Sequence, residues 1–404
     1  MNFPYSPKKW LTISLAAIVA TSIGAGAMAQ SSNDGTASQT TNQTQTQTQT
    51  TPSNQTDKAD TTTQPTAQDA AEELTLEKAV EQALKTNPKL QQARLDEKNA
   101  SVNAELTYDT VAEIPSEFVR SLDAAKQKYV SSAQAKMTEK LNKLAVQTTE
   151  NQIKLGAQQL YYALLHAQAD LELKKQSLER AQTQLKVAKA HFDVGTKAKT
   201  DILQAEMGVA GAQAALAAAE NNVEIARMKL NEFLGVDLNK KWKLSNDNKQ
   251  VAAPSMTLQQ AQEKALQQRI EITQKQEELN LAELNVKLIE EYSALSTYPG
   301  KIARNNVEKA KLAIEEQKRT ISREVAEAYY SLNAAKLGIE FKKKAKEAAA
   351  ESYRLTSLRY ENGLATTLEV IQAEEALADQ ENQYEQAVRD YNLAVVNFET
   401  ATGK

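Results

Sequence analysis

Apolar residues are spread among Glu, Lys, Gln and Ala along most of the chain after about residue 71, with few interruptions. Such mixing over long stretches is typical of helices that bury one side against neighbours. The chain has 12 Gly and 8 Pro in 404 residues, about half of average usage. Few turns and unusually long helices are therefore predicted.

The helical pattern occurs twice. The opening Leu74–Ala79 (LTLEKA) is echoed by Met256–Ala261 (MTLQQA), and Tyr161–Tyr162 is echoed by Tyr329–Tyr330. The offset of the tyrosine pairs also aligns Gly195 with Gly363 and Gly235 with Gly403. A constant offset over so long a stretch indicates an internal repeat. We expect repeat one at residues 71–240, a linker at residues 241–255 and repeat two at residues 256–404.

Each copy is expected to form four helices, of which the third is much the longest. The expected ranges are Leu76–Lys85, Pro88–Tyr108, Ser116–Asp193 and Lys199–Leu234 in the first copy, and Leu258–Gln267, Glu271–Tyr292, Gly300–Glu361 and Thr366–Thr400 in the second. At 1.5 Å per residue the third helix of the first copy would be about 110 Å long, so neighbours must cover it along its length. The second and fourth helices, placed end to end, are long enough to do so.

The predicted fold class is all-α, with two tandem four-helix repeats that form long antiparallel coiled-coil hairpins. Alanine is abundant at residues 205–219 and 345–350, and small side chains allow close approach to more than one neighbour. This favours a wall of helices. A generic coiled-coil rod, in which Ala serves helix propensity, is the alternative.

Each very long helix is followed by a glycine-containing turn. Gly195 and Gly363 stand where a left-handed residue would end a helix. Thr366 and Glu369 then form a capping box that starts the next helix, and the first copy keeps only the acid, Asp201. These turns predict one exposed tip for each helical hairpin.

Residues 1–29 have the features of an export signal. Lys8 and Lys9 precede the apolar stretch Leu11–Gly26, and Ala27–Ala29 has the A-x-A form of a cleavage site. An uncleaved anchor is the alternative. Residues 30–70 are rich in Gln, Thr, Ser and Asn, and they have too few apolar side chains to offset the entropy of ordering. We expect them to form a disordered Gln/Thr-rich linker.

The composition excludes several kinds of chemistry. The chain has no Cys, which excludes disulfides and thiolate sites, and His166 and His191 are its only histidines. No nucleotide-binding or zinc-protease motif is present. The net charge of -4 gives no basis for nucleic-acid binding. We predict no enzyme activity, no cofactor and no metal site. His191 lies beside the first tip, where a pH-sensitive contact and an ordinary solvated position are both possible interpretations.

The paired copies resemble the outer membrane efflux protein family typified by TolC. The resemblance covers residues 72–404 and adds Asn87–Leu90 (NPKL) and Leu230–Gly235 (LNEFLG) to the features above. It implies a homotrimer that forms a helical tunnel, capped by a β-barrel in the outer membrane. It also implies that the hairpin tips meet a periplasmic adaptor (membrane fusion) protein and a membrane pump. The tip residues implied to bind this partner are Gly195, Thr196, Asp201, Gly363, Leu364 and Glu369.

The sequence departs from that family between the second and third helices of each copy. The family inserts barrel strands there, and each strand needs about 9–11 residues. Leu106–Phe118 and Glu291–Gly300 each provide for one turn only. We therefore expect a TolC-like helical body without barrel strands.

The predicted function is a component of an efflux or export duct whose tips dock an adaptor. The predicted location is the cell envelope, at the outer membrane by resemblance or at the cell surface or wall if the host has no outer membrane. The alternative is a structural coiled-coil envelope protein without a conduit.

Overall fold

A computed structural model of the chain describes residues 72–245, 251–252 and 254–403, which belong to one compact unit. The predicted export signal at residues 1–29 and the predicted linker at residues 30–70 lie outside the described residues.

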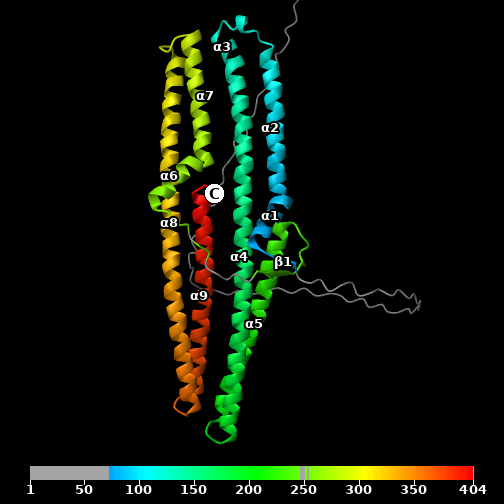
Figure 1. Ribbon diagram of the computed structural model, residues 1–404, viewed down its shortest axis with the longest axis vertical. Helices are drawn as coiled ribbons and strands as arrows, with labels where there is room; N and C mark the ends of the chain where they lie inside the picture. The colour runs from blue at the N-terminus through cyan, green and yellow to red at the C-terminus, as the bar shows by residue number, and fades with distance from the viewer. Residues whose placement is uncertain (1–71, 246–250, 253, 404) are drawn as a thin grey trace, which may run out of the picture. The chain divides into compact units, whose positions relative to one another are not determined.

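Long helices make up nearly all of the described chain (Figure 1). The first half contains β1 (Glu72–Leu74), α1 (Leu76–Thr86), α2 (Pro88–Ala112), a 3-10 turn η1 (Ser116–Phe118), α3 (Leu122–Ala125), a π-helical turn η2 (Lys126–Val130), α4 (Ser131–Asp193) and α5 (Lys199–Leu234). The second half contains β2 (Trp242–Leu244), α6 (Leu258–Gln268), α7 (Ile270–Tyr292), α8 (Tyr298–Glu361) and α9 (Thr367–Ala401). The predicted all-helical fold of long paired helices is confirmed.

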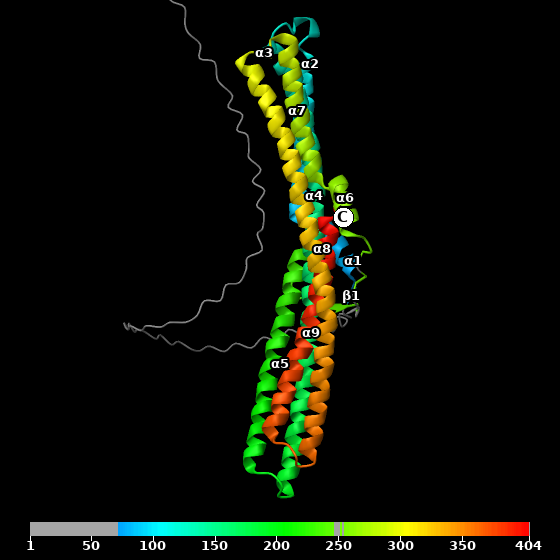
Figure 2. The ribbon, with the colours of Figure 1, turned by 90° about the vertical axis from the view of Figure 1, so that its left-hand side faces the viewer.

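The long helices α4 and α8 are each covered by two shorter ones. α2 and α5 both pack along α4, whereas α7 and α9 both pack along α8 (Figures 1 and 2). This is the arrangement expected from the helix lengths. α4 also packs against α9, and this contact joins the hairpin of α4 and α5 to the hairpin of α8 and α9.

One predicted helix start is wrong. The third helix was expected to begin at Ser116, but α3 begins at Leu122 and runs through η2 into α4. Pro115 leads into the short 3-10 turn, and Ser121 then caps α3 by accepting the N–H of Ala124 at 3.3 Å. The connection between α7 and α8 is a tight turn in which Thr297 caps α8 by accepting the N–H of Gly300.

The short strands β1 and β2 were not predicted. They pair in parallel, with Glu72 opposite Trp242 and Leu74 opposite Leu244, and they are the only strands in the described residues. β2 falls within residues 241–255, which we interpreted as a linker.

The two largest apolar clusters lie where the short helices cover the long ones. One surrounds α1 and includes Leu90, Leu164 and Leu230. The other surrounds α6 and includes Ile321 and Phe398. These clusters fix the middle of each hairpin, and a smaller cluster around Tyr360 and Val370 lies at the tip end. None of the described helices is both long and apolar enough to cross a membrane.

Candidate functional site

The turn between α4 and α5 is set by the backbone of Gly195, whose φ is 76°. Its N–H donates to the Phe192 carbonyl at 2.9 Å, and the Thr196 N–H donates further back into the last turn of α4. This pair of bonds ends a helix with a left-handed residue. A Cβ added to Gly195 would meet nothing within 4 Å, so the left-handed conformation alone favours glycine. Asp201 then accepts the N–H of Ala198 at 3.0 Å and supports the start of α5.

The turn between α8 and α9 has the same geometry and a complete cap. Gly363 has φ 76°, and the Leu364 N–H donates back into α8. Glu369 accepts the N–H of Thr366 at 2.6 Å, and the Thr366 hydroxyl accepts the N–H of Glu369 at 3.2 Å. The hydrogen bond from the Thr366 backbone holds the pKa of Glu369 below its usual value, and two nearby cations act in the same direction.

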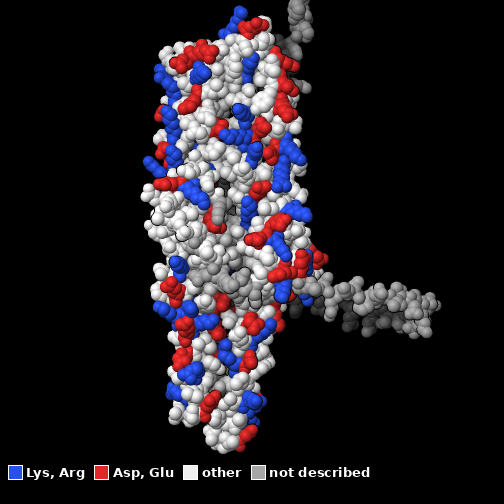
Figure 3. Space-filling model, viewed as in Figure 1, with Lys and Arg blue, Asp and Glu red and all other residues white. Residues whose placement is uncertain are grey.

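Both tips expose large apolar side chains. Val194 is 72% exposed and Leu364 is 70% exposed, one beside each turn glycine. Leu368 adds exposed apolar area in the first turn of α9, and Leu203 and Met207 add it in the second and third turns of α5. Charged residues of both signs are interspersed over the face in Figure 3, and uncharged surface is prominent at the tip end. Grouped apolar surface of this kind is typical of protein contact sites.

The two tips bind each other through buried polar groups. Thr367 and Tyr360 are fully buried. The Thr367 hydroxyl donates to the Asp201 carboxylate at 2.7 Å and shares a hydrogen bond with the Tyr360 hydroxyl at 3.1 Å. Lys197 of the first tip donates to the Ala365 carbonyl at 2.9 Å, and its Nζ lies 4.8 Å from the Tyr360 ring centre. We call these five residues the tip clamp.

His191 extends the tip clamp from the end of α4. Its ring lies edge-on to Tyr360 with the ring centres 5.5 Å apart. Its Nδ1 lies 3.1 Å from the Thr196 hydroxyl. Burial raises the pKa of Tyr360, so its hydroxyl stays neutral and available for the hydrogen bond with Thr367.

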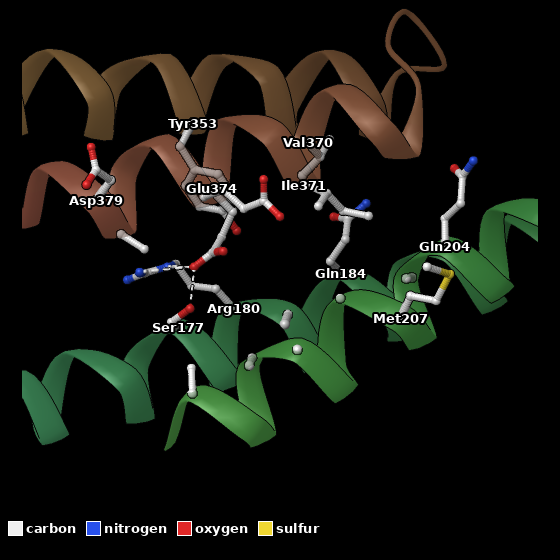
Figure 4. Close-up of a pocket in the computed structure, with 18 of the residues that line it drawn as sticks. Ser177, Arg180, Gln184, Gln204, Met207, Tyr353, Val370, Ile371, Glu374 and Asp379 are labelled. Atoms are coloured by element: carbon white, nitrogen blue, oxygen red, sulfur yellow. Dashed lines mark hydrogen bonds and ion pairs between the residues drawn. The ribbon is translucent and has the colours of Figure 1, made fainter. Parts of the chain in front are cut away.

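A second polar cluster joins α4 to α9 further from the tips. Arg180 on α4 lies 3.2 Å from Glu374 and 3.0 Å from Glu381, both on α9. Ser177 also donates to Glu374 at 2.7 Å (Figure 4). These charged side chains are mostly buried, so the geometry resembles an internal ion-pair network more than a surface pair.

A groove of about 660 Å³ lies beside this cluster, between α4, α5 and α9 (Figure 4). Gly208, Gly211 and Ala212 make the α5 wall low, and Met207 and Ile371 give the groove an apolar surface near the tips. In the described residues, no group of three or more His, Asp or Glu is placed to hold a metal ion.

The six residues predicted to bind a partner fall at the two tips, as expected from their turns. Five of them are exposed: Gly195, Thr196, Gly363, Leu364 and Glu369. Asp201 differs, because it is partly buried and holds Thr367. Their role in partner binding stays a prediction.

The sequence analysis missed the residues that join the hairpins to each other, namely Lys197, Tyr360, Thr367, Arg180 and Glu374. The sequence gives no usable signal for them beyond two of the many differences between the copies. Tyr360 aligns with Phe192 of the first copy, and Thr367 aligns with Lys199. In each of these two pairs, the residue of the second copy is buried in the tip clamp and the residue of the first copy is exposed.

The outer membrane efflux protein family model matches residues 119–236 and 300–404, which is more than half of the chain. Among curated proteins, none matches the sequence significantly.

Several solved structures have a similar fold at low sequence identity. CusC matches with a TM-score of 0.67 and 16% identity, over 81% of this chain and 92% of that one. The outer membrane protein VceC of Vibrio cholerae matches with a TM-score of 0.66 and 16% identity, over 81% of this chain and 96% of that one. The CmeC outer membrane channel of Campylobacter jejuni matches with a TM-score of 0.65 and 14% identity, over 81% of this chain and 85% of that one. At these identities the likeness establishes the fold alone.

Proposed function

Because the chain belongs to the outer membrane efflux protein family, we propose that it is a component of an efflux or export conduit built from copies of itself. The observation that carries the proposal is a set of large apolar side chains on α8 that nothing in the described chain covers. Ile302, Tyr330, Leu337 and Leu358 are all exposed. Tyr330 and Leu337 are seven residues apart, which is the spacing of a coiled-coil seam, whereas the other heptad positions between Ile302 and Leu358 hold charged residues.

The opposite edge of the unit also exposes apolar side chains. α2 and α5 pack on α4, whereas α8 lies on the far side of α9. On α2 the exposed residues include Leu95 and Val102, and on α5 they include Ala214, Ala217 and Ile225. Apolar side chains on both edges, with alanines among those on α5, allow close packing between neighbouring copies.

Two different edges that bind each other give a head-to-tail contact, which closes into a ring when the rotation permits. We propose a homotrimer, following the family resemblance. The hollow centre of such a ring would be the conduit.

Paired cysteines test this contact directly, because the natural chain has none. Leu337 on α8 and Ile225 on α5 both lie about 40 Å from the tip end of their helices, at 1.5 Å per residue. The double variant Leu337→Cys with Ile225→Cys should therefore cross-link between copies and give a trimer on a denaturing gel.

The matched control moves only the second cysteine. Met207 is exposed on α5 but lies only about 12 Å from its tip end. Leu337→Cys with Met207→Cys should give little cross-linking. Equal cross-linking in both variants, or none in either, contradicts the proposed edge contact and favours a structural spacer that forms no conduit.

We propose that the tips dock an adaptor protein of the membrane fusion type. Val194 and Leu364 present apolar surface at both tips, and protein contacts commonly bury such groups at their centre. Changing both residues to Asp should abolish co-purification of the adaptor with the tagged chain from its own cells. Leu238→Asp, at an exposed apolar position away from the tips, is the control. Adaptor capture that survives the tip changes contradicts this assignment.

We propose that the chain is exported to the cell envelope and begins, once mature, at Gln30. The support is the arrangement of Lys8, Lys9, the apolar stretch and the A-x-A site in the sequence. Cell fractionation with N-terminal sequencing tests this proposal. A cytoplasmic chain that keeps residues 1–29 contradicts it.

A further inference from the structure

His166 lies on α4 at the contact between α4 and α9. Its side chain is partly buried, and its Nε2 is buried without a hydrogen-bond partner. The charged groups that act on it are Asp170 on α4 and Arg389 and Asp390 on α9. A neutral imidazole can keep Nε2 without a proton, so that no unpaired N–H donor is buried there. A protonated imidazole has two N–H donors and a charge.

The two acids near His166 already have partners. Asp170 accepts a hydrogen bond from Asn382 at 3.1 Å and lies 3.7 Å from Lys174. Asp390 pairs with Arg389 at 2.8 Å. A proton on His166 would therefore add a second cation near Arg389, where both nearby carboxylates already have another partner. Burying an unpaired charge is costly.

The contact in question is the one that joins the two hairpins. α4 packs closely against both α5 and α9. The α4–α9 contact is the largest link between the two hairpins, and a smaller contact joins α5 to α9. A charge at this contact favours separation of the two hairpins and leaves the pairing within each hairpin intact.

We propose that His166 makes the joint between the hairpins sensitive to acid. Protonation of its buried imidazole weakens the packing of α4 against α9, so that mild acid loosens one hairpin from the other. This inference does not depend on the conduit or on the adaptor.

The direction of the pH effect follows from the environment. Burial lowers the pKa of His166, and the charge of Arg389 lowers it further, against the opposing effect of Asp170 and Asp390. When the hairpins separate, the imidazole regains water and takes up the proton more readily. The joint is therefore fully stable above about pH 6.5 and loses stability as the pH falls below that value. Each unit by which the pKa is lowered corresponds to about a tenfold larger separated population.

The pKa itself can be measured without ambiguity. The chain has two histidines, so the variant His191→Gln leaves a single imidazole for NMR. The pKa of this imidazole should be lower than the pKa of free histidine. A pKa at or above that value overturns the proposal.

Hydrogen exchange of the full-length protein tests the consequence. Between pH 7 and pH 5, corrected for intrinsic rates, amides of α4 and α9 near His166 should lose protection in the parent, while the tips change less. His166→Gln should remove this loss, and His191→Gln should keep it. Carboxyl groups are the same in all three proteins, so their contribution cancels. An acid response that persists in His166→Gln, or is absent from the parent, overturns the proposal.

Discussion

The tip clamp gives the sharpest test of how the two hairpins are held together. Thr367→Val keeps the shape of the side chain but removes its hydroxyl. Asp201 then loses a donor at 2.7 Å, and the fully buried Tyr360 hydroxyl loses its partner at 3.1 Å. A hydrogen bond to a charged group contributes about 1.5–3 kcal/mol, and a buried unsatisfied hydroxyl costs about 1–3 kcal/mol.

Asp201 is only partly buried and keeps its bond to the Ala198 N–H, so water can replace part of the loss. We therefore expect the variant to lower the free energy of local opening at the tips by about 2 kcal/mol. This corresponds to about 30-fold faster hydrogen exchange in both tips. The effect must reach the start of α5, because Thr367 belongs to the other hairpin.

Thr196→Val is the matched control. The Thr196 hydroxyl is exposed and donates to the His191 carbonyl within its own turn, so its loss should change local stability by less than about 0.5 kcal/mol. A double-mutant cycle between Thr367→Val and Asp201→Asn should give a coupling of about 1–2 kcal/mol. Equal exchange in the two valine variants, or a coupling near zero, would refute the clamp.

Three further changes test other parts of the structure. Arg180→Met leaves two mostly buried carboxylates without their cation, so we expect a loss of about 2–4 kcal/mol, measured by hydrogen exchange along α4 and α9; unchanged exchange would contradict the network. The pKa of Glu369 is lowered, so the cap with Thr366 is stable above about pH 4.3 and weakens as the pH falls through the folded value; NMR of the second tip should show this acid step, and Glu369→Gln should lack it. Gly300→Ala places a Cβ 2.6 Å from the backbone of the preceding turn and should lower the free energy of unfolding by about 1–3 kcal/mol. Gly211→Ala meets open space and should raise the free energy of unfolding by about 0.5–1 kcal/mol. Thermal unfolding measures both changes.

The helices could be predicted because their ends are decided by local chemistry. The expected range of α5, Lys199–Leu234, is the observed one, since a turn glycine stands shortly before it and Gly235 ends it with φ 63°. The start of α4 could not be placed from the sequence. Pro115 interrupts the helical course only briefly, and the chain resumes it after Ser121 and continues through η2. Local signals mark where a helix can begin, and packing with α7 then selects one of them.

The joint between the hairpins could not be predicted from a comparison of the two copies. That comparison selects residues that the copies share, and shared turn residues are mostly exposed. Tyr162 is buried, whereas its counterpart Tyr330 is 62% exposed. The same local sequence meets different neighbours in each copy, so the contacts between the copies are asymmetric and appear only in three dimensions.

The mass and shape of the purified mature protein show whether copies of the chain build a conduit. Light scattering gives the number of copies in the particle, and electron microscopy of the same sample shows whether it is hollow. We predict a hollow particle of three chains whose helical body is about 100 Å long. A stable, solid monomeric rod would contradict it.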